Sequence, residues 1–234
     1  MKFENTEVWG FEHALRGMRN AMESWNKSDS GICKGGDNGI GCDNCATKEE
    51  CKHSYDKEFK IGKNDMKLAQ TLIRAGSADS KYLRMIHVAV DINMPRYWWS
   101  EADTYHFNIK NSCSTMHKLL NNNNPITLDM FVICEEDADW WNYTVNKLES
   151  LRLEYKEVQR TTKDSKVMNR LLVRAKRMLP EGFEQTRTFD TNYAELRNMY
   201  FQRRHHRLQE EWVDTFCKWI EMLPYAKELI MYEG

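Results

Sequence analysis

Apolar residues recur at the spacing of a helix face along most of this chain, and glycine, asparagine or proline separates the periodic segments. The first such run predicts an opening helix over residues 7–26. Further helices are predicted over residues 64–75, 95–105, 139–162, 163–178, 191–204 and 208–222, with a shorter helical segment from residue 127. The chain is therefore predicted to be mostly helical.

Two short runs depart from the helical pattern. Residues 87–92, HVAVDI, are apolar and β-branched and predict a buried strand, and residues 186–189 form a second β-prone segment. The sequence NNNNP at 121–125 predicts a loop. Many helices and few strands indicate an α+β protein, predominantly helical with a small central sheet that is antiparallel or mixed. We expect its 234 residues to form a single domain, 1–234.

Residues 28–55 differ from the rest of the chain because they hold five glycines and four cysteines. The cysteines are Cys33, Cys42, Cys45 and Cys51. A structural zinc ion takes four thiolate or imidazole ligands, and a C-x2-C pair supplies two of them. Only one such pair is present, so a flexible loop with free thiols is the alternative interpretation. In either case the segment is interpreted as an insertion that takes no part in catalysis.

The overall charge and composition limit the classes of partner. The chain has 34 lysines and arginines against 35 aspartates and glutamates, so no global positive field would hold bulk nucleic acid or a membrane surface. No apolar run approaches the roughly 20 residues of a membrane-spanning helix, and the first residues lack the apolar core of a signal peptide. Seven cysteines, an odd number, suggest reduced thiols. We therefore expect a cytoplasmic protein.

Residues 174–212 concentrate cations in a chain whose net charge is only −1. Arginine presents two parallel donors that match two phosphate oxygens. The stretch therefore predicts an anion site. Its candidate arginines are Arg174, Arg177, Arg187, Arg197, Arg203 and Arg204.

Two shorter motifs each allow a structural and a functional interpretation. Residues 96–101, RYWWSE, could form a packed core helix or a cleft wall whose rings stack on a ligand. Residues 111–117, NSCSTMH, could cap the helix that follows, could hold phosphate through hydroxyl and backbone groups, or could pair Cys113 with His117 as nucleophile and base. Adjacent His205 and His206 are interpreted as a solvated helix end rather than as metal ligands.

The stretch from residue 192 to 212 resembles the flavin-dependent thymidylate synthases. That family carries the signature "A-R-x-x-L-P … T … N-x-R-x-x-x-N/H-F-x-x-L-R … A-Q-x-E-I". The matching residues stand in the same order: Ala175, Leu179, Pro180, Thr186, Asn192, Asn198, Arg203, Gln209 and Glu211. A weaker resemblance extends over about residues 64–222 and includes the segment 78–84 and the helix that starts at Arg96.

The resemblance implies a thymidylate synthase-like fold, FAD as cofactor and a pyrimidine nucleotide such as deoxyuridylate as ligand. It implies a homotetramer with the site at a subunit junction. The residues that it suggests for nucleotide binding are Arg203, Lys176, Arg177, Ser114, Arg96, Tyr97 and Trp98. Those that it suggests for the flavin are Asn192, Asn198 and Arg207.

The departures from the family pattern keep several functions open. The family's Arg-His-Arg triplet is Ser100, Glu101 and Ala102 here, and one further flavin-side arginine is Ala194. An acid in this place inverts the charge where an anionic flavin or a developing enolate would need cations. One hypothesis is a transferase of nucleotide biosynthesis that methylates or otherwise modifies uracil C5. The others are a nucleotide binder without turnover and a zinc-stapled interaction module.

Overall fold

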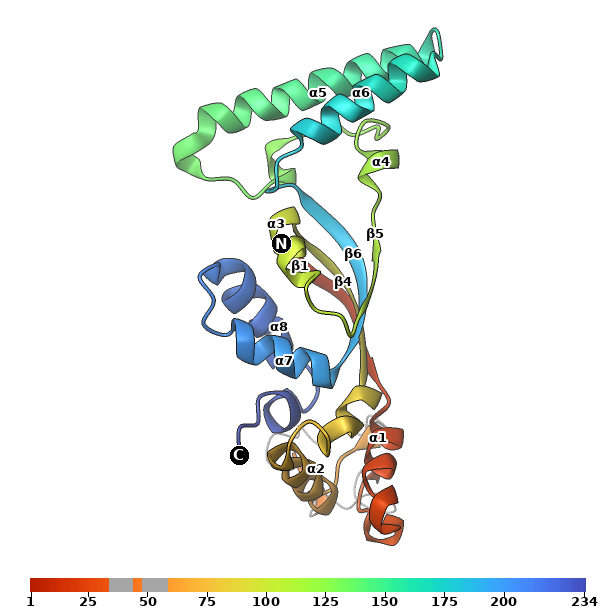
Figure 1. Ribbon diagram of the computed structural model, residues 1–234, viewed down its shortest axis with the longest axis vertical. Helices are drawn as coiled ribbons and strands as arrows, with labels where there is room; N and C mark the ends of the chain where they lie inside the picture. The colour runs from red at the N-terminus through yellow and green to blue at the C-terminus, as the bar shows by residue number, and fades with distance from the viewer. Residues whose placement is uncertain (34–43, 48–58) are drawn as a thin grey trace. The chain divides into compact units, whose positions relative to one another are not determined.

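The computed structural model describes residues 1–33, 44–47 and 59–234 (Figure 1). Its α-helices are α1 (Phe11–Met18), α2 (Lys63–Ala75), α3 (Arg96–Ala102), α4 (Thr115–Lys118), α5 (Ala138–Arg160), α6 (Ser165–Met178), α7 (Tyr193–Arg203) and α8 (Lys218–Glu221). Its strands are β1 (Lys2–Trp9), β2 (Gly31–Ile32), β3 (Phe59–Lys60), β4 (His87–Pro95), β5 (Ile109–Ser112) and β6 (Glu184–Asn192). The shorter helical turns include the 3-10 helices η5 (Ser80–Met85) and η7 (Glu135–Asp137).

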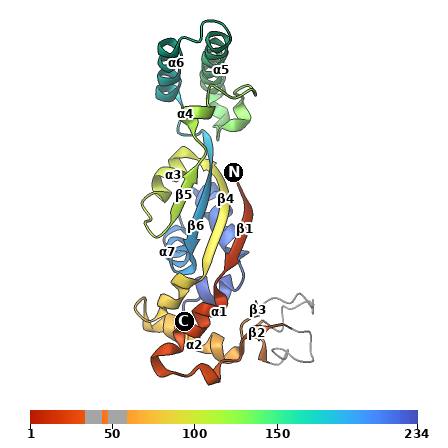
Figure 2. The same ribbon diagram turned by 90° about the vertical axis from the view of Figure 1, so that its right-hand side faces the viewer.

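The main sheet has the strand order β1-β4-β6-β5 (Figure 2). On β4 the residues Val88, Val90, Ile92 and Met94 are buried and alternate with partly exposed ones, so one face of this strand packs into the core. The predicted strand 87–92 is therefore confirmed and extends to Pro95. The chain is mostly helical and contains a small antiparallel sheet. The predicted α+β fold class is therefore confirmed.

The chain divides into two compact units. The first unit comprises residues 1–4, 91–106 and 110–189, and the second comprises residues 5–90, 107–109 and 190–234. Every strand of the main sheet contributes residues to both units. The prediction that the chain is a single domain stays a prediction.

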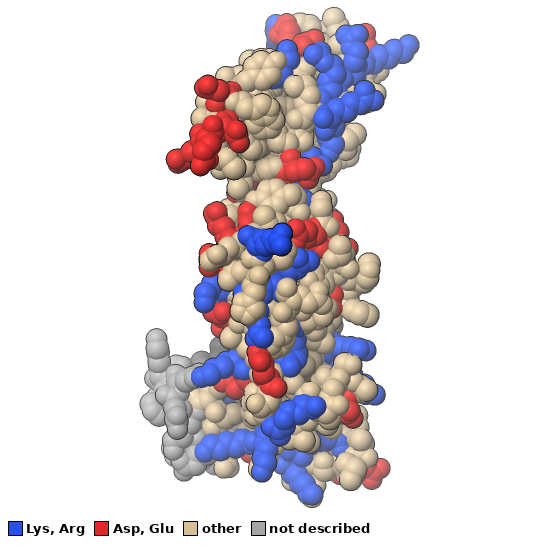
Figure 3. Space-filling model, turned by 60° about the vertical axis from the view of Figure 1, so that its left-hand side comes forward, with Lys and Arg blue, Asp and Glu red and all other residues tan. Residues whose placement is uncertain are grey.

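In the first unit, α5 and α6 form an antiparallel hairpin (Figure 1). Leu148 and Leu151 of α5 pack in one apolar cluster with Leu171 and Ala175 of α6. The Asp164 carboxylate accepts backbone N–H groups at the first turn of α6 and fixes where that helix begins. Acidic side chains gather at the η7 end of this hairpin and basic ones along α6 (Figure 3).

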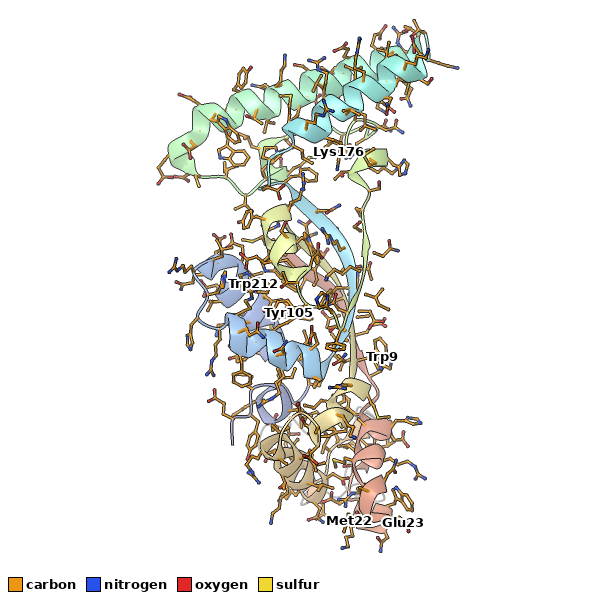
Figure 4. All side chains as sticks on the ribbon, in the orientation of Figure 1. Trp9, Met22, Glu23, Tyr105, Lys176 and Trp212 are labelled. Atoms are coloured by element: carbon orange, nitrogen blue, oxygen red, sulfur yellow. The ribbon has the colours of Figure 1, made fainter. Side chains whose placement is uncertain are left out.

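In the second unit, Gly10 separates β1 from α1. Its φ of 96° is open to glycine, and a Cβ at this position would lie 2.1 Å from the carbonyl oxygen of Met85. The predicted continuous helix over 7–26 is therefore wrong. The strand runs through Trp9, whose ring stacks on His87 with centroids 5.4 Å apart (Trp9 is labelled in Figure 4), and the helix starts only at Phe11.

A buried ion pair fastens the start of α2. The fully buried Asp65 carboxylate lies 2.6 Å from the Arg19 guanidinium and accepts hydrogen bonds from the Ser28 and Ser30 hydroxyls. Burial alone would raise the pKa of Asp65, but these hydrogen bonds and the charge of Arg19 outweigh burial and hold the pKa below its ordinary value. From this anchor α2 runs to Ala75 and ends at Gly76, as predicted.

The last predicted helix, 208–222, has a different winding from the one expected. Residues 209–217 form a π-helix, and only residues 218–221 are α-helical. Trp212 and Phe216 are fully buried within this segment, and their rings meet edge to face at 5.2 Å. Nothing in the period of the apolar residues distinguishes these two windings. No helix in the described part of the chain is both long and apolar enough to cross a bilayer.

Candidate functional site

The second unit contains a cavity of about 580 Å³. Its walls come from the end of α2, the 3-10 helix η5, the segment at Phe107 and one face of α7. The lining residues include Ser77, Ser80, Arg84, Phe107, Asn192, Ala194, Arg197, Asn198, Phe201 and Gln202. The structure thus brings together Asn192 and Asn198, the two asparagines that the sequence suggested for a flavin.

One wall of the cavity is α7, which is fixed by several hydrogen bonds. The Asn192 side chain caps the helix by accepting the backbone N–H of Glu195 at 3.1 Å. Next to it, the buried Tyr193 donates its hydroxyl to the carbonyl of Pro224 at 2.5 Å. Further along, Asn198 is exposed and accepts a hydrogen bond from Gln202 at 2.7 Å. These contacts hold a row of side-chain amides along the cavity wall.

Arg197 lines the same wall, but its guanidinium donates hydrogen bonds to the protein backbone. It donates to the carbonyls of Ile230 and Tyr232 at 2.7 and 2.6 Å. Burial lowers its pKa. The guanidinium also lies 4.7 Å from the ring centroid of Phe201. Arg197 therefore fastens the C-terminal segment to α7.

Another wall is η5, which is held against α2. The Ser80 hydroxyl donates to the carbonyl of Gly76 at 2.9 Å, and the buried Tyr82 donates to the carbonyl of Ala69 at 3.0 Å. Arg84, near the end of η5, is exposed, and its guanidinium lies 5.9 Å from the ring centroid of Phe107. Phe107 as a residue is 68% exposed. The resemblance includes the segment 78–84, which ends at Arg84, but the sequence assigned no binding role to Arg84 or Phe107, because only the fold brings them to one cavity.

A second group of predicted residues gathers in the first unit, around Lys176 on α6 (Figure 4). Its ammonium donates to the Thr115 hydroxyl at 2.5 Å. Burial, together with the nearby Arg96, lowers the pKa of Lys176. Arg96 is itself paired with Glu181 at 3.0 Å. Thr115 and Ser114 also line a smaller cavity of about 160 Å³.

Ser114 acts as the cap of α4. Its hydroxyl accepts the backbone N–H of His117 at 3.3 Å, so the capping interpretation of NSCSTMH is confirmed. Beside it, the backbone N–H of Cys113 donates to the carbonyl of Thr186 at 2.9 Å. The Cys113 side chain is exposed.

The two indoles of α3 are packing groups. Trp98 and Trp99 are fully buried, with ring centroids 4.8 Å apart. A fully buried ring cannot stack on a ligand, so Trp98 follows the core interpretation of RYWWSE. Tyr97 is partly buried, and its backbone N–H donates to the carbonyl of Glu181 at 3.1 Å.

A carboxylate just after α3 pairs with two cationic side chains. Asp103 is bonded to Arg187 of β6 at 3.0 Å and paired with Lys110 of β5 at 3.3 Å. The Arg187 guanidinium also lies 4.4 Å from the ring centroid of Trp99. The sequence analysis did not predict that Arg187 meets these partners, because the three residues come from separate segments of the first unit.

The remaining predicted residues lie outside the lining of both cavities. Arg203 lies 4.4 Å from the ring centroid of Trp212 (labelled in Figure 4), and it belongs to the second unit. Arg207 is exposed in the same unit. Arg177 is exposed on α6, in the first unit.

The predicted zinc ligands fall partly outside the described residues. Cys42 and Cys51 are among the residues that the structure does not describe. Cys33 is partly buried and Cys45 is buried, and both are free thiols. Within the described ranges no group of three or more histidine, cysteine, aspartate or glutamate residues could hold a metal ion. The zinc site stays a prediction.

The fold can be compared with known proteins. No family model matches the sequence, and no curated protein matches it. Two similar solved structures are both of the flavin-dependent thymidylate synthase ThyX from Helicobacter pylori, with FAD and dUMP. They are 15% and 16% identical, with TM-scores of 0.60 and 0.61, and each match covers 100% of this chain and 98% of the other. The chain thus has the fold of the flavin-dependent thymidylate synthases.

Proposed function

We propose that this chain is a nucleotide-binding protein that holds a flavin nucleotide in the large cavity of the second unit. One observation carries the proposal: Asn192 and Asn198, which the sequence suggested for a flavin, line the same cavity. The solved structures with this fold contain FAD and dUMP.

The chemistry of the cavity fits such a ligand. A flavin nucleotide has a planar ring with polar edges, a sugar chain and phosphate. The wall offers amides from Asn198 and Gln202, hydroxyls from Ser77 and Ser80, an exposed aromatic ring and a guanidinium. Mostly apolar walls with a few convergent polar groups are typical of cofactor sites. A bound flavin would supply hydride transfer.

We further propose that the cations of the first unit bind the phosphate of a pyrimidine nucleotide. Lys176 and Arg96 lie close enough for Arg96 to lower the pKa of Lys176. Like charges held near each other are relieved by an anion. Arg177 on the same helix and the Ser114 hydroxyl would add donors, and the partly buried Tyr97 would contact the base. Deoxyuridylate is the nucleotide that we expect.

A second candidate is a binder without turnover, and the composition of α3 favours it. After Arg96 this helix continues with Tyr97, two buried indoles, Ser100, Glu101 and Ala102. Stabilising developing negative charge requires fixed cations or donors near the reacting ring. In this interpretation the protein sequesters or senses a nucleotide. In the enzyme interpretation, one-carbon transfer to uracil C5 would need cations from elsewhere.

The first experiment is an absorption and fluorescence titration of the purified protein with FAD, followed by calorimetry with deoxyuridylate. A bound-flavin spectrum that Asn198→Ala weakens, and that Asn142→Ala leaves unchanged, would support the cavity; Asn142 is an exposed asparagine on α5. Release of the methylated product from deoxyuridylate, a methylene donor and chemically reduced FAD, which supplies the hydride, would select the enzyme. Binding of both ligands without product would select the sequestering protein. Failure of FAD to bind at any concentration would refute the flavin proposal.

A further inference from the structure

Arg84 and Phe107 are the exposed cation and the exposed aromatic residue of the cavity lining. Arg84 is exposed, and its guanidinium lies 5.9 Å from the ring centroid of Phe107. No carboxylate in the described part of the chain is paired with it. Phe107 is held by its backbone, because its carbonyl accepts the Thr191 hydroxyl at 3.2 Å. The residue is 68% exposed and lies at the cavity wall.

The other cation and the other ring of the lining are already engaged. Arg197 donates to two backbone carbonyls, so its donors are used within the chain. Phe201 has two guanidinium groups within 4.7 Å of its ring centroid, those of Arg197 and Arg204, and Arg204 is further paired with Glu233. Among the described lining residues, Arg84 and Phe107 therefore present the cation and the ring that a ligand can still engage.

We propose that Arg84 and Phe107 form the recognition pair of this cavity. Phe107 stacks on the planar ring of the ligand, and Arg84 binds its phosphate through the two parallel donors of the guanidinium. This assignment rests on the proposed flavin binding and makes it more specific. The cavity then prefers a phosphorylated flavin over the same ring without phosphate.

The two roles separate cleanly when three ligands are compared. Riboflavin has the ring without phosphate, FMN adds one phosphate, and FAD adds a diphosphate and adenosine. Loss of the Arg84 cation should weaken the binding of the phosphorylated ligands only, since a charge-assisted hydrogen bond to phosphate is lost. Loss of the Phe107 ring should weaken the binding of all three ligands, since all three contain the flavin ring that stacks on it.

The test measures the Kd of riboflavin, FMN and FAD by flavin fluorescence with the full chain. For Arg84→Ala we expect FMN and FAD to bind about 10- to 100-fold more weakly, with riboflavin unchanged. For Phe107→Ala we expect all three to bind roughly 2- to 10-fold more weakly. Arg84→Gln, which keeps the length and removes the charge, should behave like Arg84→Ala.

Matched controls come from the same segments. Lys81→Ala removes a cation from η5 outside the cavity lining, and Ile109→Ala removes an exposed apolar side chain two residues from Phe107. Both should bind all three ligands as wild type does. The proposed pair is refuted if wild type binds FMN and both Arg84 variants bind FMN as tightly as wild type does. If wild type binds none of the three flavins, the proposed function fails first and the pair fails with it.

Discussion

The large cavity of the second unit and the Lys176 cluster of the first unit contain similar residue types in opposite arrangements. The cavity is wide, about 580 Å³, and its amides, ring and exposed cation are spread over several elements. The cluster is tight: Lys176 lies near Arg96 and is bonded to Thr115, and Thr115 borders a space of about 160 Å³. The first arrangement suits a long planar ligand and the second a compact anion. Lys176, which the resemblance suggests for the nucleotide, and Asn192, which it suggests for the flavin, thus lie in different regions of the structure.

The two regions also differ in how their shape is maintained. The cavity walls are held by contacts that face away from the ligand space, such as Tyr193 to Pro224 and Tyr82 to Ala69. The cluster is held by the very side chains that would bind a ligand. Mutations of the exposed lining residues Arg84 and Phe107 should therefore change affinity with little effect on stability, whereas mutations in the cluster should also rearrange their neighbours.

The largest effect is expected where the second unit depends on its buried ion pair. Asp65→Asn removes the charge that compensates the buried Arg19, which typically costs about 3–5 kcal/mol in unfolding free energy. Because α2 leads from this anchor to Gly76 at the cavity, FAD should also bind more weakly. Chemical denaturation and a FAD titration would measure both. Unchanged stability would show that the pair does not maintain the fold.

The same pair predicts a pH dependence with a defined sign. Hydrogen bonds hold the folded pKa of Asp65 below its ordinary value, so its contribution is complete above about pH 4, the unfolded pKa. It is lost as the pH falls through the folded pKa. The stability difference between wild type and Asp65→Asn should therefore be largest at neutral pH and should shrink below pH 4. A difference that stays constant from pH 7 to pH 3 would contradict this origin.

The next effect should fall on the first unit alone. Lys176→Ala removes a cation from the proposed phosphate site, and we expect deoxyuridylate to bind about 10- to 100-fold more weakly. FAD affinity should not change if the two regions act on different ligands. Calorimetry with each ligand measures both affinities. Lys166→Ala, an exposed lysine on the same helix, is the control. Equal losses of affinity for deoxyuridylate and FAD would contradict the assignment of the two ligands to different regions.

A pH titration of the same binding event sharpens this point. Burial and Arg96 lower the pKa of Lys176, so it loses its charge at a lower pH than an ordinary lysine. Deoxyuridylate affinity should therefore fall as the pH rises through this lowered pKa, and Lys176→Arg should remove that fall because arginine stays charged. Kd values measured across the alkaline range would test it. Identical pH profiles for wild type and Lys176→Arg would show that Lys176 does not bind the phosphate.

The sequence predicted best what is determined locally. The helix that starts after Asp164 and the one that stops at Gly76 carry their own capping signals, and both lie where they were expected. The break at Gly10 was missed because it depends on the carbonyl of Met85, which is distant in the sequence. Asn192 and Asn198 were found through the family signature. The segment that ends at Arg84 was part of the weaker resemblance, but no role was predicted for Arg84 or Phe107, because no local pattern shows that the fold brings them together.

The smallest predicted effect distinguishes a purely structural cap from one that also lines a site. Asp164 caps α6 outside either cavity lining, and Asn192 caps α7 at the wall of the large cavity. Replacing either by alanine removes the same kind of hydrogen bond and should cost about 1 kcal/mol in unfolding free energy. Only Asn192→Ala should also weaken FAD binding, because of the two caps only the Asn192 side chain lies at the cavity. Thermal denaturation and FAD titration of the two variants side by side would test it. If both variants lose equal stability and neither loses FAD affinity, then Asn192 is a cap alone and the flavin must be held by other groups of the wall.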